Sequence, residues 1–175
     1  LLQSGQASGI YFALPTQLTS NKIHERFDSF LEKILMPESR INQHSMLLHG
    51  SAWLLDSFEM GVEGQPGQSW FNQKKRGLLA KFGVGTLDQA LMAAMNVKHG
   101  FVRAFGLAGK VVILDEVHTY DEYTGSILDS LIRLLEQLGC TIIVLSATLS
   151  SSRRHLLLQG ANNADQYPMV TYKNA

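Results

Sequence analysis

The chain has one cysteine, Cys140, among 175 residues, so it can form neither an internal disulfide nor a zinc site built on paired cysteines. The apolar surroundings of Cys140 favour a small buried side chain, and this sparse use of cysteine indicates a reducing compartment, the cytoplasm. No apolar run approaches the roughly 18 residues of a membrane-spanning helix, so we expect no membrane partner. A composition of 45% hydrophobic and 17% charged residues is typical of one globular domain.

The formal net charge is zero, but the charges are unevenly distributed along the chain. Residues 68–110 hold seven basic residues against Asp88 alone, and residues 111–140 hold six acidic residues against Arg133 alone. A basic stretch beside an acidic one fits a path for a polyanion next to a metal site. Solvated charged faces produce the same pattern, so both interpretations stay open.

Short apolar runs alternate with stretches of helical spacing. Strands are expected at residues 10–14, 45–52, 78–80, around 84, 110–116 and 140–148. Helices are expected up to about residue 36, from about residue 87, through 127–138 and around 153–159, with a polar Gly/Pro-containing loop at 59–68. This alternation predicts an α/β fold, a three-layer parallel sheet with helices on both faces.

The segment VVILDEVH at 111–118 places two adjacent carboxylates, Asp115 and Glu116, directly after an apolar strand. Adjacent carboxylates repel one another, and a nearby dication offsets that repulsion. Nucleotide hydrolysis uses one carboxylate to hold Mg²⁺, through water, and its neighbour to activate the attacking water. We interpret Asp115 as the magnesium residue and Glu116 as the water-activating residue. A solvent-exposed loop that happens to begin with Asp-Glu is the alternative.

The segment LSATL at 145–149 ends the next strand along the chain. One crossover helix separates the two strands, so the hydroxyls of Ser146 and Thr148 are expected beside the acidic pair. The alternative is a helix cap, which Ser150 could provide instead.

A phosphate-binding loop with the pattern G-x-x-x-x-G-K-[ST] is missing from the sequence. The nearest match, AFGLAGKV at 104–111, has Ala for the first Gly and runs into a strand rather than opening a helix, so it cannot cradle a phosphate. The sequence therefore lacks the segment that would bind the phosphates of ATP.

The segments ALPTQ, VGTLDQ, DEVH and LSATL follow the order of the first RecA-like lobe, of P-loop NTPase type, in superfamily 2 helicases. Three longer stretches resemble the CRISPR-associated helicase-nuclease of type I interference systems: YFALPTQLTSNKIHERF, LLAKFGVGTLDQALMAAM and VVILDEVHTYDEY. The resemblance covers about residues 10–150. It implies that residues 1–160 are a partial first RecA-like ATP-binding domain, truncated at its N-terminus, and that residues 161–175 begin a linker toward a second lobe.

The resemblance also implies an ATP-driven enzyme that moves 3′ to 5′ along single-stranded DNA, after a guide-RNA surveillance complex has opened the target. The implied cofactors are ATP and Mg²⁺, and the resemblance implies a phosphate-binding loop upstream of residue 1. On that expectation the isolated chain hydrolyses ATP poorly or not at all. The further implied partners are a second RecA-like lobe, which carries an arginine finger, and an HD nuclease domain. In that scheme Asp115 and Glu116 serve Mg²⁺-ATP, and His118 helps to link the nucleotide to the second lobe. Ser146 and Thr148 couple hydrolysis to movement.

By the same resemblance the DNA path is lined by Pro15, Thr16, Gln17, Gly85, Thr86 and Asp88. A translocase holds the phosphate backbone without reading bases, and small hydroxyls and backbone amides at strand ends suit that task. Thr16 and Thr86 each precede a helix whose N-terminus favours phosphate, and Gln89 would complete a capping box with Thr86. A plain helix cap is an equally strong interpretation of each threonine, and the two roles are compatible.

Two alternatives remain open. The chain could belong to another DExH helicase acting on RNA or DNA, which a preference for DNA over RNA in an ATPase assay would separate. It could also be a non-catalytic RecA-like binding module that has lost its nucleotide site. The intact pair of Asp115 and Glu116 argues against such loss.

Overall fold

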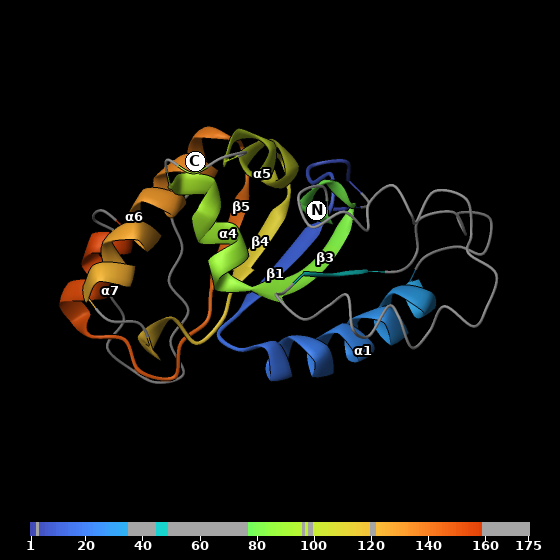
Figure 1. Ribbon diagram of the computed structural model, residues 1–175, viewed down its shortest axis with the longest axis horizontal. Helices are drawn as coiled ribbons and strands as arrows, with labels where there is room; N and C mark the ends of the chain where they lie inside the picture. The colour runs from blue at the N-terminus through green and yellow to red at the C-terminus, as the bar shows by residue number, and fades with distance from the viewer. Residues whose placement is uncertain are drawn as a thin grey trace.

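The computed structural model describes residues 1–2, 4–34, 45–48, 77–95, 97, 100–119 and 122–158. In these residues five strands form one sheet: β1 Ile10–Leu14, β2 Met46–Leu48, β3 Phe82–Thr86, β4 Val111–Leu114 and β5 Thr141–Val144. The strand order is β2-β3-β1-β4-β5, and every neighbouring pair is parallel (Figure 1). The carboxyl ends of all the strands therefore lie at one edge of the sheet, where such folds bind ligands.

Helices cover both faces of this sheet, which confirms the expected three-layer arrangement. The described helices are α1 Gln17–Ile34, α4 Leu87–Ala94, α5 Gly100–Leu107, α6 Glu122–Gln137 and α7 Ser151–Leu158, with short 3₁₀ turns η2 Gly77–Leu79 and η3 Val117–Thr119. Figure 1 shows α1 on one side of the strands and α4, α5 and α6 on the other. Among the described residues, no helix combines the length and the apolar character needed to cross a membrane.

Side chains of the central strand β1 alternate between two apolar cores. Tyr11 and Ala13 are fully buried on the face covered by α4 and α6. Leu14 and Phe12 point to the opposite core, where the ring of Phe27 from α1 meets the ring of Phe12 edge-on at 5.3 Å between centroids. A strand buried on both faces must be apolar throughout, which is why residues 10–14 read as one continuous apolar run.

The α1 side of the sheet is less completely covered at β5. The parallel register sets Phe12, Ile113 and Ile143 side by side across β1, β4 and β5. Helix α1 packs over β1 and β3, while Ile143 and Leu145 keep 38% and 43% of their surface exposed. Within the described part of the chain, no strand pairs with the outer edge of β5. Parallel sheets are normally covered on both faces, so this open apolar area can accept further structure.

The sequence predicted most of these elements, but the strand expected at 78–80 is wrong. Residues Gly77–Leu79 form the turn η2 instead, and the carbonyls of Leu78 and Ala80 accept hydrogen bonds from the buried Lys110 ammonium rather than from a neighbouring strand. Helix α5 was not predicted, and its glycines at both ends have low helix propensity. Phe30 and Ile34 recur at helical spacing with the buried residues Phe27 and Leu31, but their side chains are half-exposed on α1. Expectations for residues 49–52, 59–68 and 159–175 lie outside the described residues.

Two glycines in β3 make room for the ring of Tyr11. A Cβ atom at Gly83 would lie 3.0 Å from Cδ2 of Tyr11. A Cβ atom at Gly85 would lie 2.7 Å from the Tyr11 hydroxyl and closer still to the carbonyl of Leu48. The side chain of Tyr11 therefore fills the space that side chains at positions 83 and 85 would otherwise take.

We expect Gly85→Ala to lower the free energy of unfolding by about 1–3 kcal/mol, because the added methyl group forces backbone or ring to move. Gly125→Ala, within α6, is the matched control. A Cβ atom at position 125 would meet only the Arg153 side chain, at an ordinary contact distance of 3.8 Å. That substitution should raise the free energy of unfolding by about 0.5–1 kcal/mol through helix propensity. Urea denaturation of both variants measures the two effects. Equal effects of the two substitutions would contradict the packing argument.

Lys110 is a buried cation beside the amino ends of the strands. Its side chain is 5% exposed, and Nζ donates to the Leu78 carbonyl at 2.7 Å and to the Ala80 carbonyl. Burial lowers the pKa of this ammonium from 10.5 to about 8, and nearby Cys140 opposes that shift only in part. The folded state therefore releases this proton at a lower pH than the unfolded state does.

Between about pH 8 and 10.5 the unfolded chain binds the Lys110 proton more tightly, so the contribution of Lys110 to stability rises with pH. Relative to Lys110→Met, the wild-type free energy of unfolding should increase by up to about 3 kcal/mol across this interval. Urea denaturation at several pH values measures the difference. Replacement of the exposed Lys22 by Met should leave the pH dependence of the free energy of unfolding unchanged. A difference between wild type and Lys110→Met that does not change with pH would refute the lowered pKa of Lys110.

Candidate functional site

Polar residues follow four strands at the carboxyl edge of the sheet. Thr86 ends β3, Thr16 follows β1, Asp115 follows β4, and Ser146 follows β5. Because the strand order is β3-β1-β4-β5, Thr86 lies beside the Thr16 end, and Asp115 lies beside the Ser146 end. The edge is thus divided into a hydroxyl-bearing half on β3 and β1 and an acidic half on β4 and β5.

The acidic half begins with Asp115, which is fixed through its backbone. Its amide donates to the carbonyl of Ala13 at 2.9 Å, and its Oδ1 accepts the amide of Glu116 at 2.9 Å. Glu116 has a φ of 55°, a left-handed backbone conformation that costs a non-glycine residue about 1 kcal/mol or more. Buried Val117 then donates its amide to Leu145 at 3.3 Å, which ties this turn to β5.

His118 connects the ends of β4 and β5. Its Nδ1 lies 3.2 Å from Oγ of Ser146 and 3.3 Å from Oε2 of Glu116. The Ser146 hydroxyl donates its own hydrogen to the carbonyl of Thr148 at 3.1 Å. With its hydrogen on Thr148, Ser146 Oγ accepts, as does the Glu116 carboxylate, so both contacts favour a proton on Nδ1 of neutral His118.

The carboxylates at this edge could hold a magnesium ion only together with other ligands. Among the described residues, no group of three or more His, Cys, Asp and Glu side chains could hold a metal by itself. Magnesium usually takes one or two carboxylates and completes its shell with water and phosphate oxygens. Asp115, with Glu116 next to it at the sheet edge, offers the carboxylate that such a site needs.

The two threonines of the hydroxyl-bearing half differ. Thr16 caps α1, since its Oγ1 accepts the amide of Thr19 at 3.2 Å and its amide donates to Thr19 Oγ1 at 3.3 Å. Thr86 is 6% exposed and makes no side-chain cap on α4, so the predicted capping box is wrong. Gln89 cannot complete that box because its Oε1 accepts Nη1 of Arg103 at 2.9 Å.

The remaining residues predicted for this half lie around the same two helix starts. Gln17 is exposed as the first residue of α1, and Pro15 before it is partly buried. Asp88 is exposed in the first turn of α4, while Gly85 is buried beneath it. The fold therefore brings all six predicted path residues to one edge of the sheet.

Helix α7 starts directly after the LSATL segment and is fixed to α6. Arg153 donates to both carboxylate oxygens of Asp129, at 2.8 and 2.6 Å, and to the carbonyl of Gly125 at 3.1 Å. Ser150 caps this helix by accepting the amide of Arg153 at 3.2 Å. The cap thus comes from Ser150, as the alternative interpretation of the segment allowed.

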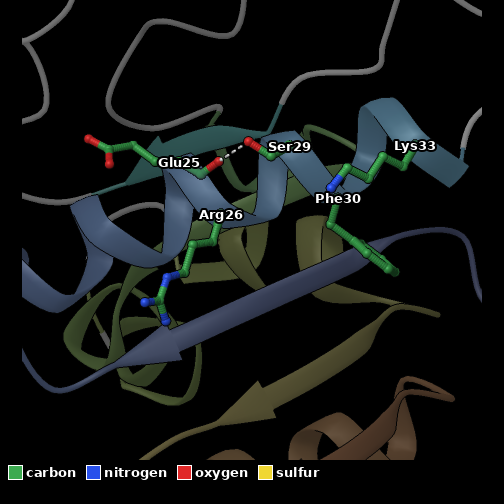
Figure 2. A pocket seen from close by; sticks show the side chains of 5 residues that line it. All are labelled: Glu25, Arg26, Ser29, Phe30 and Lys33. Atoms are coloured by element: carbon green, nitrogen blue, oxygen red, sulfur yellow. Dashed lines mark hydrogen bonds between the residues drawn. The ribbon is translucent and has the colours of Figure 1, made fainter.

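A shallow pocket of about 480 Å³ lies against α1 (Figure 2). All its lining residues come from that one helix: Glu25, Arg26, Ser29, Phe30 and Lys33. Figure 2 shows Arg26 and Phe30 extending from the same side of α1, and the Ser29 hydroxyl donates to the carbonyl of Glu25 at 3.1 Å. None of the residues predicted for the site lines this pocket.

No family model matches the chain. Curated relatives do match over almost its whole length. The CRISPR-associated endonuclease/helicase Cas3 of Thermus thermophilus is 44% identical over 173 residues, which cover 91% of this chain and 18% of that protein. The nuclease/helicase Cas3 of Streptococcus thermophilus is 34% identical and covers 95% of this chain and 21% of that protein.

Solved structures agree with these relatives. Crystalline T. fusca Cas3 superposes with a TM-score of 0.74 at 39% identity, over 85% of this chain and 16% of that one. The chain is a homologue of the RecA-like helicase region of Cas3. It spans about a fifth of the length of its curated Cas3 relatives.

Two further findings concern Cas3 itself. T. fusca Cas3 has been solved with ADP, with AMPPNP and with ATP, and each structure has a helicase region that superposes on this chain at a TM-score of 0.72 or 0.73. A chain of a CRISPR RNA-guided surveillance complex in a pre-nicking state superposes with a TM-score of 0.55 at 35% identity. The resemblance stated from the sequence motifs, to a CRISPR-associated helicase-nuclease, is thereby confirmed.

Sequence reasoning missed three contacts near this edge. These are the Arg103 bond to Gln89, the Tyr11 bond to Thr86 and the proximity of Glu116 to His118. The two glycines spaced two apart in FGVGT were the available signal for Tyr11, because such spacing in a strand marks close approach of another group. No comparable signal exists for Arg103, since its partner depends on how α5 packs against α4.

We expect neutral His118 to be the Nδ1–H tautomer, because both of its Nδ1 neighbours are acceptors. Nitrogen chemical shifts of the imidazole measure the tautomer directly. Ser146→Ala should leave only Glu116 as an acceptor for Nδ1 and should raise the fraction of neutral His118 in the Nε2–H tautomer. Ser130→Ala on α6 should leave that fraction unchanged. An Nε2–H tautomer in the unmodified protein would contradict the geometry.

Proposed function

We propose that the protein carrying this chain is an ATP-dependent translocase and helicase of single-stranded DNA in CRISPR antiviral defence. It moves 3′ to 5′, binds a guide-RNA surveillance complex and supplies DNA to an HD nuclease. The observation that carries the proposal is the edge at which an acidic half, with Asp115, adjoins a hydroxyl-bearing half, with Thr16. The proposal includes the cytoplasmic location and the division into residues 1–160 and 161–175.

On the acidic half, Asp115 would hold Mg²⁺ through water and Glu116 would orient the attacking water. Bound Mg²⁺ supplies charge neutralisation for the phosphates of ATP. The 3.3 Å approach of Glu116 to His118 supports a role for the imidazole in holding that carboxylate in position. Ser146 and Thr148 follow on the adjacent strand end, so a change at the nucleotide can reach α7 through His118.

On the hydroxyl-bearing half, the starts of α1 and α4 would hold the DNA backbone. Helix N-termini present amide hydrogens and a partial positive charge to phosphate, and neither feature depends on base sequence. Thr16 and Gln17 at α1 are exposed, as is Asp88 at α4. Thr86 is mostly buried, so it would contribute through its backbone more than through its hydroxyl.

A phosphate-binding loop would come from a segment that packs at β5. Support comes from the exposed Ile143 and Leu145 and from the outer edge of β5, which pairs with no described strand. A strand added there would place its carboxyl end beside Ser146 and near the acidic pair. The isolated chain should then hydrolyse ATP poorly, because charge stabilisation by that loop is worth orders of magnitude in rate.

The test is the ATPase rate of the full-length protein with and without single-stranded DNA, measured also for Glu116→Gln. DNA should stimulate the rate, and Glu116→Gln should lower it at least about 100-fold because a water-activating group is lost. Glu32→Gln, at an exposed position near the end of α1, is the matched control and should retain the wild-type rate.

RNA in place of DNA separates the competing functions. Stimulation by RNA as strong as by DNA would indicate another DExH helicase. A rate that responds neither to nucleic acid nor to Glu116→Gln would leave a RecA-like module without motor activity and would overturn the proposal.

A further inference from the structure

A partly buried polar cluster lies directly under the start of α4. Tyr11 of β1 is fully buried, and its hydroxyl donates to the carbonyl of Thr86 at 3.3 Å. Arg103 of α5 donates from Nη1 to Oε1 of Gln89 at 2.9 Å and more weakly to the Gln89 carbonyl at 3.4 Å. The first turn of α4 is therefore held from two sides, by one residue of the sheet and one of α5.

The electrostatics join these contacts into one cluster. Burial raises the pKa of Tyr11 well above its usual range, and the nearby charges of Arg103 and Asp88 act on it in opposite directions. Burial also lowers the pKa of Arg103, while Tyr11 opposes that shift. A guanidinium that is half removed from water needs acceptors of fixed position, and Gln89 supplies two of them.

The packing leaves the cluster little freedom. Gly85, next to Thr86, approaches the Tyr11 hydroxyl so closely that even a methyl group would clash. The α4 start cannot shift toward the sheet without meeting Tyr11. It cannot rotate about its axis without breaking the bond between Gln89 and Arg103.

We propose that Arg103 and Tyr11 are positioning residues for DNA binding, which set the orientation of residues 85–89 at the DNA path. This inference rests on the proposed function, because it assigns these two residues to the DNA-binding half of that same site. Arg103 acts through Gln89, and Tyr11 acts through the Thr86 carbonyl. Neither residue contacts the acidic half, so their loss should weaken DNA binding and leave the hydrolysis step intact.

The experiment measures the ATPase of the full-length protein against the concentration of single-stranded DNA. In Arg103→Met the DNA concentration for half-maximal rate should rise about three- to tenfold, the range that loss of one partly solvated hydrogen bond implies. The rate at saturating DNA and the half-saturating ATP concentration should stay within twofold of wild type. Tyr11→Phe should produce a smaller rise of the same kind, and Arg103→Lys, which keeps a donor, should restore part of the affinity.

A thermodynamic cycle with Gln89→Leu tests whether the pair acts as a unit. The double variant with Arg103→Met should bind DNA no more weakly than either single variant. The control is Arg133→Met, which removes an equal charge from an exposed position of α6 and should change DNA affinity less than twofold. Additive effects, or a loss of affinity in the control equal to that in Arg103→Met, would overturn the inference.

Thermal denaturation of each variant excludes a general loss of structure, and rates are compared well below the lowest melting temperature. If wild-type ATPase responds to DNA while Arg103→Met keeps the wild-type half-maximal concentration, the positioning role is wrong and the proposed function survives. If the wild-type rate does not respond to DNA at all, both fail.

Discussion

Pairing of β1 with both β3 and β4 is the constraint on which the rest of the structure depends. Residues 10–14 bond in parallel register to residues 82–86 on one side and to 111–114 on the other. Buried backbone groups must be paired, and a strand in the centre of a sheet can satisfy them only with two neighbours. Once both registers are set, segments distant in sequence end at one edge.

Burial of apolar side chains on both faces of β1 stabilises this pairing. Full burial of a Leu or Phe side chain contributes about 1.5–3 kcal/mol, and Leu14, Leu31, Phe82 and Leu114 are all buried to 2% exposure or less. Two buried polar side chains in these layers are hydrogen-bonded. Lys110 binds two carbonyls, and Tyr11 binds a third.

The carboxyl edge of the sheet is less regular than the core, and the candidate site lies there. Glu116 has a left-handed backbone conformation, and the neighbouring His118 and Ser146 are bound to one another across two strand ends. Local strain of this kind persists when the surrounding structure fixes the residue from several sides, and it is common at functional sites. Here the anchors are the Asp115 amide on β1 and the Val117 amide on Leu145.

The sequence by itself determined which segments form the central strands, where most helices lie and which polar residues follow the strands. These features depend on local periodicity and on residue type, as in the runs IYFAL and VVIL. It also identified Asp115, Glu116 and Ser146 as neighbours, since one crossover helix separates their strands.

Only the tertiary structure decided the conformation of residues 78–80 and the hydrogen-bond partners of Thr86 and Gln89. Lys110 donates to a carbonyl of the first segment, and Arg103 binds the Gln89 side chain that was expected to cap α4. Those partners lie 14 to 32 residues away along the chain. No local pattern records such contacts, because they depend on how whole helices pack.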